Sequence, residues 1–339
     1  GRYCDVLGVA RDVCAADHPP ARHPDGEHPA LGLCGDERAQ TENRVLAVGL
    51  PSGRVIGRAN VPGDPEYVAI SPRRAGSVVV VVSASAGTVT LLDLHSLRPL
   101  RVFHGFVSPH IPAIFPVGDI AYVTDDGDGR LTVIGLAARR ILARVAVGAG
   151  AHHLAISPDW RQVWVALGQS AHSIVTLSTM LATPPPPATP VGDPVHPHVT
   201  GRFDPGFLAH DLLFTPDGRR VWITSADTSY VAVVSARTHR LLFRVPGGAP
   251  PQHVVFDGAF AYITSGYGGL IEKVRVQDGR VLKRAAAPFG SFDLDAARGY
   301  VVTVSLTQGT LAIYDRSLRL LHIRHLAPST EDVAIARRP

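Results

Sequence analysis

The sequence predicts an all-β fold, a seven-bladed β-propeller of four-stranded antiparallel blades. First, a two-strand motif recurs seven times; its clearest copy, residues 151–167, reads as a strand, a tight Pro-Asp turn and a second strand. Second, five of the six intervals between the central apolar residues of successive copies lie between 38 and 44 residues. A repeat of this length filled with short strands is typical of propeller blades. The central residues are Ile70, Ile114, Ile156, Phe214, Phe256, Leu294 and Ile335.

Each repeat continues with two further strands. In the first full repeat, residues 88–94 form a third strand and residues 100–104 an outer strand. Glycine, Asp-Gly and Pro-Asp turns separate the strands, as hairpins require. Helical periodicity is absent. The corresponding third strands are expected at residues 44–50, 130–136, 173–178, 230–235, 270–276 and 310–315.

The two ends of the chain are expected to close the ring together. The chain ends after an inner strand, near Ala336, whereas residues 44–50 and 54–60 form strands with no inner strand before them. Combining these pieces completes the seventh blade and leaves no open sheet edge. Residues 3–10, which alternate in polarity, are the candidate for the missing second strand of that blade.

Residues 1–43 are expected to be a separate segment rich in cysteine, proline and histidine, and residues 44–339 to be the propeller domain. Prolines beside His18, His23 and His28 favour a solvated loop over a metal site. The three cysteines all lie in this segment, and one disulfide among them with one thiol left over would fit an oxidising compartment. Three reduced thiols in a cytosolic tail is the alternative. The cysteines are Cys4, Cys14 and Cys34.

Composition narrows the partners. The chain has 339 residues and is 45% hydrophobic, which is enough apolar content for one large core. Its net charge is +4. Its basic residues are nearly all scattered arginines, so a nucleic-acid interface is not expected. No apolar run is long enough to span a membrane. The chain does not begin with methionine, which favours a removed signal peptide or an expression tag, and we expect a secreted or periplasmic monomer.

Three short segments carry a family resemblance. Residues 121–125 (AYVTD), 221–225 (VWITS) and 261–265 (AYITS) each follow a tight turn and resemble the YVTN repeats of bacterial seven-bladed propellers. The Gly-His and Trp-Asp signatures of WD40 repeats are absent. The resemblance implies a propeller over about residues 44–336. It leaves the activity open, because similar propellers include surface-layer and periplasmic binding proteins, lactonases and an antibiotic-opening lyase.

The candidate site comes from aligning the repeats. Loops that lead into the innermost strands of a propeller bring one residue per blade toward a common axis, and the position four residues before the central apolar residue is polar. Imidazole and carboxylate groups are ligands of zinc, iron, manganese and copper, and three histidines leave coordination positions open. The sequence therefore predicts a divalent transition metal held by His110, His152 and His210. The whole column is Glu66, His110, His152, His210, Gln252, Gly290 and Glu331.

Further roles follow from this column. Glu66 and Glu331 are the candidate catalytic general bases. The next column supplies residues that would orient the imidazoles or bind substrate. The columns two and four residues after the histidine column are apolar, so polar groups are expected at one end of the predicted channel. The bland alternative is that these histidines are hydrated channel-lining residues. The expected orienting or substrate-binding residues are His153, Asp211, Gln252, His253, Asp332 and Phe207.

Residues 183–209 form a proline-rich insertion after the third strand of one blade. Its second half leads to His210, so Arg202, Phe203 and Phe207 would form a lid over the axial mouth, with His196 and His198 as extra polar groups. A loop that only fills the blade edge is the alternative. The acidic run at residues 125–129 lacks the glutamate of an EF-hand and favours an ordinary turn.

The sequence thus predicts an extracytoplasmic metalloprotein that acts on a small molecule at the axial mouth, as a lyase, hydrolase or oxidase. The signatures of other enzyme classes, including the nucleophile elbow, the Walker loop, the dinucleotide fingerprint and His-Glu-x-x-His, are absent from the sequence. The alternative is a non-catalytic binding or scaffold propeller outside the cytoplasm.

Overall fold

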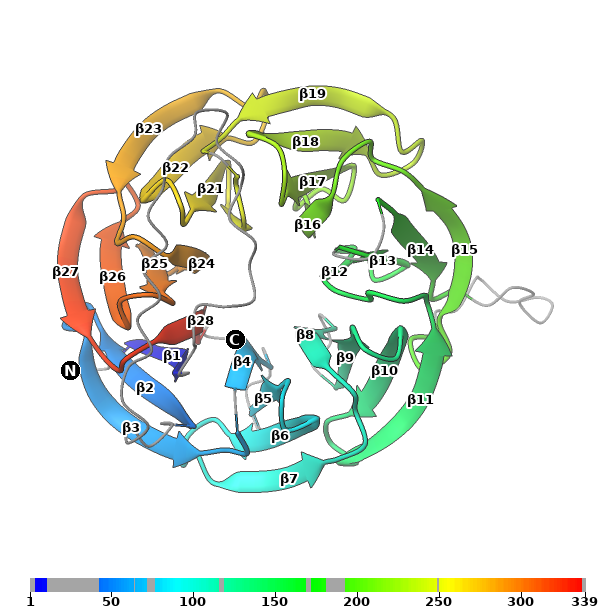
Figure 1. Cartoon of the computed structure of the whole chain (residues 1–339), viewed down its shortest axis with the longest axis horizontal. Helices are drawn as coiled ribbons and strands as arrows, with labels where there is room; N and C mark the ends of the chain where they lie inside the picture. Colours follow the sequence, from blue (N-terminus) through cyan, green and yellow to red (C-terminus); the bar gives the residue numbers. More distant parts are fainter. Residues whose placement is uncertain are drawn as a thin grey trace, which may run out of the picture.

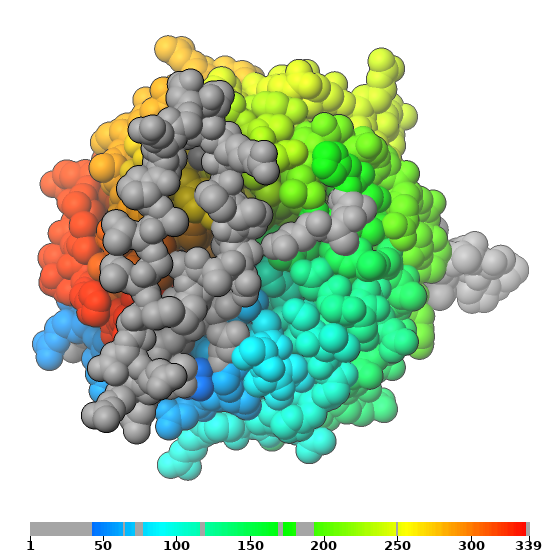
Figure 2. Space-filling model, in the orientation of Figure 1, coloured from blue at the N-terminus to red at the C-terminus, as the bar shows by residue number. Residues whose placement is uncertain are grey.

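We describe a computed structural model of the chain. It describes residues 43–63, 65–71, 77–115, 119–168, 172–180, 193–248 and 250–336, together with the backbone of residues 4–10. All regular elements in this part of the chain are β-strands, arranged in four-stranded antiparallel sheets around a central axis (Figure 1). Figure 2 shows the same face with the sheets in sequence order around the ring.

Six of the sheets consist of four strands that follow one another in the sequence. Blade one contains β4 (Pro65–Ile70), β5 (Val78–Ser83), β6 (Thr88–Asp93) and β7 (Pro99–Phe103). Blade two contains β8 (Pro109–Ile114), β9 (Ile120–Asp125), β10 (Arg130–Gly135) and β11 (Arg140–Ala146). Blade three contains β12 (Leu154–Ile156), β13 (Gln162–Ala166), β14 (Ile174–Ser178) and β15 (His198–Phe203).

The next three blades repeat this order. Blade four contains β16 (Ala209–Phe214), β17 (Arg220–Ser225), β18 (Tyr230–Ser235) and β19 (Leu241–Pro246). Blade five contains β20 (Val254–Asp257), β21 (Phe260–Ser265), β22 (Leu270–Arg275) and β23 (Val281–Ala286). Blade six contains β24 (Ser291–Ala297), β25 (Tyr300–Ser305), β26 (Thr310–Asp315) and β27 (Leu320–His325).

The remaining four-stranded sheet is composite. It pairs β28 (Thr330–Ile335) with β1 (Cys4–Ala10), then β2 (Arg44–Leu50) and β3 (Arg54–Asn60). Strand β28 also contacts β24 and β4, so this sheet lies between blade six and blade one. The two ends of the chain therefore meet in one sheet.

The expectation of seven blades, one of them closed by both chain ends, is corrected to six blades and one composite sheet. Six blades built from consecutive strands are complete in the described residues, whereas the composite sheet takes its strands from both chain ends and its second strand, β1, is described by backbone pairing alone. The physical reason is that no continuous run of the chain contains all four strands of this sheet. Its inner strand, β28, comes from the C-terminal end of the chain and the other three strands come from the N-terminal end.

The blades pack through apolar wedges. Second and third strands are almost entirely buried because both of their faces are covered by neighbouring blades, and the β-branched run of β5 is an example. Large aromatic side chains on the second strands, including Trp164 and Trp222, are fully buried and fill the space between sheets. Outer strands such as β19 are largely exposed. The inner strands β4, β8, β12, β16, β20, β24 and β28 surround the axis (Figure 1).

Candidate functional site

Polar side chains gather where the inner strands begin. The main chain at this end of the axis is held by threonines from the second strands, one blade away. Thr124 Oγ1 in β9 donates to the carbonyl of His152, 2.6 Å away, and Thr224 Oγ1 in β17 donates to that of Gln252, 2.5 Å away. Thr264 in β21 donates to the carbonyl of Phe292 in the same way. The threonine of the YVT-like motif therefore fixes the position, along the axis, of the main chain that carries the site residues of the next blade.

Five histidines meet at the axis. His110 stacks on His152 with ring centroids 3.8 Å apart, and His153 lies in the middle of the group. The ring centroid of His153 is 4.6 Å from that of His210 and 5.0 Å from that of His253. Tyr67 packs edge-on against His110 at 4.6 Å. These side chains come from blades one to five and form what we call the histidine cluster.

The Nδ1 atom of each clustered histidine faces an acceptor. His152 Nδ1 lies 3.1 Å from Asp126 Oδ2, His110 Nδ1 lies 3.4 Å from Glu66 Oε2, and His210 Nδ1 lies 3.2 Å from the carbonyl oxygen of Gln252.

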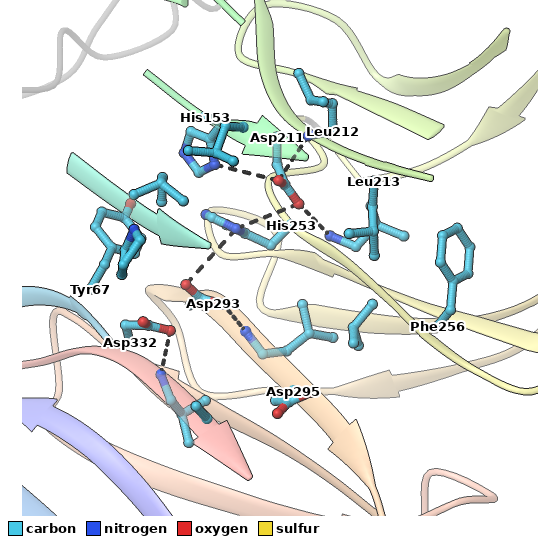
Figure 3. Close-up of a pocket in the computed structure, with 18 of the residues that line it drawn as sticks. Tyr67, His153, Asp211, Leu212, Leu213, His253, Phe256, Asp293, Asp295 and Asp332 are labelled. Carbon is cyan, nitrogen blue, oxygen red and sulfur yellow. Dashed lines mark hydrogen bonds and ion pairs between the residues drawn. The ribbon is translucent and has the colours of Figure 1, made fainter. Parts of the chain in front are cut away.

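Asp211 serves the two remaining imidazoles. Its Oδ1 lies 3.4 Å from His153 Nδ1 and its Oδ2 lies 3.7 Å from His253 Nδ1 (Figure 3). Asp293 Oδ2 is 3.9 Å from the same nitrogen of His253. In a neutral imidazole whose Nδ1 donates to such acceptors, Nε2 keeps its lone pair.

Two overlapping groups in the described part of the chain have the spacing of a metal site. In each group the three ligand atoms lie within 4.8 Å of one another, and His153 belongs to both. His153 is 1% exposed, and its Nε2 is buried with no hydrogen-bond partner among the described residues. An orphaned buried nitrogen is costly unless something else binds it. The groups are His110, His152 and His153, and His153, His210 and His253.

Burial keeps the imidazoles neutral. It lowers the pKa of His152 to about 4, with the neighbouring His110 acting in the same direction and Asp126 opposing it. It lowers the pKa of His253 to about 3. Burial also holds the pKa values of His153 and His210 well below the usual range. At neutral pH all four are thus in the form that ligates metals.

Three buried carboxyl groups lie beside the cluster on the next level of the axis. Asp211 accepts the backbone N–H groups of Leu212 and Val254, and Asp332 accepts those of Val68 and Val333. Asp293 accepts the backbone N–H of Leu294 and interacts electrostatically with Asp332.

Burial raises the pKa of all three carboxyl groups. It raises that of Asp211 to about 7, and the pKa values of Asp293 and Asp332 also lie above the usual range because both carboxyls are buried and interact with each other.

A cavity of about 440 Å³ runs along the axis from these carboxyl groups. Tyr67, His153 and His253 line its polar end, and Phe214, Pro216 and Phe256 lie near the opposite end of the inner strands. Figure 3 shows Asp211, Asp293 and Asp332 on one side of this space and Phe256 far from them. Polar groups were expected at one end of the axis only, whereas Asp295 also lines the cavity, two residues beyond Asp293.

The structure groups the predicted ligands differently from the sequence alignment. It places His110 and His152 together with His153, and His210 with His153 and His253. His153 and His253, expected to support the ligands, are themselves members of the two groups. Glu66 faces His110, and Gln252 is turned aside because its Oε1 accepts the backbone N–H of Gly266.

Sequence reasoning missed Asp126, Asp293 and Tyr67. Asp126 lies in the acidic turn between β9 and β10, where its contact with His152 could not be read from spacing. Asp293 was hidden by a register error. Asp293 shares a level with Asp211 and Asp332, and Phe292 rather than Gly290 occupies the preceding column, since Thr264 donates to the carbonyl of Phe292 as Thr224 does to that of Gln252. The repeated Asp-apolar step at residues 211–212, 293–294 and 332–333 is the signal that could have revealed it.

The insertion supplies a blade edge. Its described residues, 193–209, include the outer strand β15, whose Phe203 packs on Trp164. Arg202 donates to the carbonyl of Val147, and Phe207 is buried in the core between blades three and four. The edge-filling alternative therefore describes these residues. His18, His23, His28, Cys14 and Cys34, and the side chain of Cys4, lie outside the described residues.

Fold and site together define a β-propeller with an axial cluster of buried histidines. A family model described as the cytochrome D1 heme domain matches residues 73–175, less than half of the chain. No curated protein sequence matches the chain significantly. No helix in the described part of the chain has the length and apolar character to span a membrane.

Solved structures are similar in fold. A functionally unknown protein from Desulfotomaculum acetoxidans is 14% identical with a TM-score of 0.70, covering 88% of this chain and 97% of its own. Hydrazine synthase from Kuenenia stuttgartiensis is 15% identical with a TM-score of 0.66, covering 82% and 90%. The dihydro-heme d1 dehydrogenase NirN in complex with DHE is 17% identical with a TM-score of 0.58, covering 85% and 62%. At these identities the similarity shows the fold; membership of the YVTN-repeat family stays a prediction.

Proposed function

We propose that this chain is an extracytoplasmic propeller metalloprotein that binds a first-row transition metal ion in the histidine cluster for chemistry on a small molecule. The observation that carries the proposal is the orientation of the five imidazoles. Each Nδ1 faces a carboxylate or carbonyl oxygen, which fixes the tautomer that offers Nε2 as a ligand.

The group formed by His110, His152 and His153 is the better ligand set. Each of its imidazoles faces a carboxyl oxygen, from Glu66, Asp126 and Asp211 respectively, and Asp211 is shared with His253. Carboxylates that accept from a ligating histidine orient the ring and raise its basicity. In the second group, His210 has only a backbone carbonyl as its partner. Zinc, iron, manganese and copper all suit imidazole ligands.

Bound there, such an ion would supply Lewis acidity or redox chemistry. The chain would contribute a dry pocket of neutral imidazoles. Glu66 would orient His110 rather than take a proton from substrate, because its carboxylate is directed at that ring. The orienting role thus replaces, in this proposal, the general-base role expected for Glu66, and the general-base role of Glu331 stays a prediction.

Heme is the second candidate, because the matching family model and the NirN structure are named for it. The side chains present do not fit it. A porphyrin needs a wide open space around the nitrogen that would bind its iron. Around His153 this space is taken by the rings of His110, His152, His210 and His253, whose centroids lie 4.6–5.3 Å from that of His153. Among the described residues, the cavity lining contains Asp211, Asp293, Asp295 and Asp332 and neither lysine nor arginine, whereas heme brings carboxylates of its own.

Metal analysis of the purified protein tests the proposal. We expect close to one equivalent of a transition metal and no absorption band of a bound porphyrin. His153→Ala should weaken metal binding by at least about 10–100-fold, since changes of orienting residues alone have effects of that size. His196→Ala is the matched control, because His196 is exposed and contacts only Asp193. A protein that binds no divalent metal at neutral pH would leave the non-catalytic binding propeller as the function.

A further inference from the structure

The cavity next to the histidine cluster has the properties of a second binding site. Its volume of about 440 Å³ lies within the range of small-molecule sites. Its two ends differ in chemistry, since Tyr67, His153 and His253 line one end and Phe214 and Phe256 the other. A ligand of this size would reach from the polar layer to the aromatic side chains.

Polar and apolar atoms both line the wall. Among the described residues, the inner strands present aliphatic side chains and a proline to the axis, and Asp295 is the polar side chain between the carboxyl layer and the far end. Both carboxyl oxygens of Asp295 accept backbone N–H groups, those of Ala296 and Ile335. The aliphatic wall residues are Val68, Ile111, Pro112, Leu154, Leu212, Leu213, Val254, Val255, Leu294, Val333 and Ala334.

The described lining contains carboxyl groups and, besides the neutral imidazoles, no basic side chain. Asp211, Asp293 and Asp332 stand at one end, held in place by backbone N–H groups. Each carboxyl oxygen that accepts one N–H still has a lone pair available for another donor. The lining therefore favours a cation with N–H donors and rejects an anion.

An inorganic cation does not account for this end. In the described part of the chain, the groups that bring three ligand atoms within 4.8 Å consist of histidines alone. The aliphatic wall residues would also have no role in binding an ion. The partner that fits both the carboxyl groups and the wall is an organic molecule with one cationic end and an apolar body.

We propose that this cavity binds a primary ammonium ion with an apolar body, its nitrogen against Asp293 and Asp332 and its body along the aliphatic wall. Such an ammonium compound would be the substrate of the proposed metal site, and this part of the inference rests on the proposed function. Its binding in the cavity does not depend on that function. The reacting end of such a molecule would lie beside Tyr67 and His253, which both line the cavity next to the histidine cluster.

Titration calorimetry with three probes of similar size tests the charge preference. The probes are 2-phenylethylammonium, the neutral 2-phenylethanol and the anionic 3-phenylpropionate. We expect the ammonium probe to bind at least about tenfold more tightly than the alcohol, a difference of one hydrogen-bonded charge contact, and the anion not to bind. Equal or tighter binding of the anion, or no binding of the ammonium probe, would overturn the proposal.

Variants locate the site. Asp293→Asn keeps the shape of the side chain but cannot pair with the ammonium ion as a carboxylate, so affinity for the ammonium probe should fall about 30-fold or more. Asp159→Asn, on an exposed turn, is the control and should leave affinity unchanged. Ala334→Leu narrows the cavity without changing its charge and should also abolish binding. If Asp293→Asn fails to fold, the probe comparison and Ala334→Leu still decide the question.

Measuring metal content on the same samples separates this inference from the proposed function. Ammonium binding without any bound metal would support the cavity ligand and contradict the metalloprotein. Bound metal with no preference for the ammonium probe would do the reverse.

Discussion

At the scale of single residues, the most informative side chains are those whose oxygen atoms face the Nδ1 atom of a clustered histidine. Asp126 shows why such residues are hard to find in a sequence. It belongs to an acidic run that fits an ordinary turn, and the turn does form, with Asp125 accepting the backbone N–H groups of Val107 and Ser108. Asp126, one position on, instead faces His152 of the next blade. Its role depends on how two blades pack.

Asp126→Asn should therefore weaken metal binding. The amide cannot stabilise the Nδ1–H of His152 as a carboxylate does, so we expect metal affinity to fall by about 10–100-fold with little change in melting temperature. Competition against a chromophoric chelator measures this. Asp128→Asn is the control in the same turn, because Asp128 contacts Arg130 and no histidine. Equal affinity in both variants would show that Asp126 has no role in the site.

The pH dependence of stability provides a second prediction at this scale. The pKa of Asp211 is raised from an ordinary 3.8 to about 7, so its contribution to the stability of the metal-free protein is present below 3.8 and lost as pH rises through 7. The pKa values of His152 and His253 are lowered to about 4 and 3, so their contributions are present above 6.5 and lost as pH falls toward those values. The two effects oppose each other between pH 4 and 6.5.

Asp211→Asn removes the carboxyl group whose contribution to stability falls as pH rises. The free energy of unfolding of the metal-free variant should rise more steeply with pH between 4 and 6.5 than that of the wild-type protein. Chemical denaturation at a series of pH values in the presence of a chelator measures the slopes. Parallel curves would contradict the assignment of a raised pKa to Asp211.

At the scale of strands, the second strand of each blade does two tasks. Its aromatic and β-branched residues fill the wedge between sheets, and its threonine anchors the beginning of the next inner strand. The first task could be predicted from the sequence, because alternation and β-branching are local signals. The second could not, because the acceptor is a backbone carbonyl that no side-chain pattern records.

Thr224→Val tests the anchoring role. It leaves the carbonyl of Gln252 without its hydroxyl donor, which should lower the free energy of unfolding by about 1–2 kcal/mol. Because His210 Nδ1 also faces this carbonyl, the environment of His210 should change as well, visible in its imidazole NMR signals. Thr200→Val on the outer strand β15 loses a similar hydrogen bond far from the axis and should leave these signals unchanged.

At the scale of the whole molecule, the period of the repeat was enough to predict a propeller of four-stranded antiparallel sheets and the joining of the chain ends in one sheet. Blade number and register could not be predicted in the same way. Six blades are built from consecutive strands and the remaining sheet from both chain ends. In β24, Leu294 resembles the central apolar residue of the other copies but pairs as Leu212 does, so spacing alone placed Asp293 two positions away from its level.

Closure of the ring yields a further prediction. Strand β28 is bonded to its neighbours on both sides, since Asp332 accepts the N–H of Val68 and Asp295 accepts that of Ile335. Removing residues 330–339 should therefore abolish cooperative thermal unfolding, measured by circular dichroism. Removing residues 337–339 alone leaves β28 whole and should have little effect. An unchanged melting temperature in the longer deletion would refute this arrangement of the closing strand.

The threonine anchors also bear on how such a ring can evolve. The backbone position of a site residue in one blade depends on a hydroxyl in the preceding blade, as with Thr124 and His152. Because the acceptor is a backbone carbonyl, it is present whatever side chain the site residue carries. Site residues can therefore be exchanged one blade at a time while the threonines stay, and selection experiments that vary the site residues should recover variants that keep these threonines.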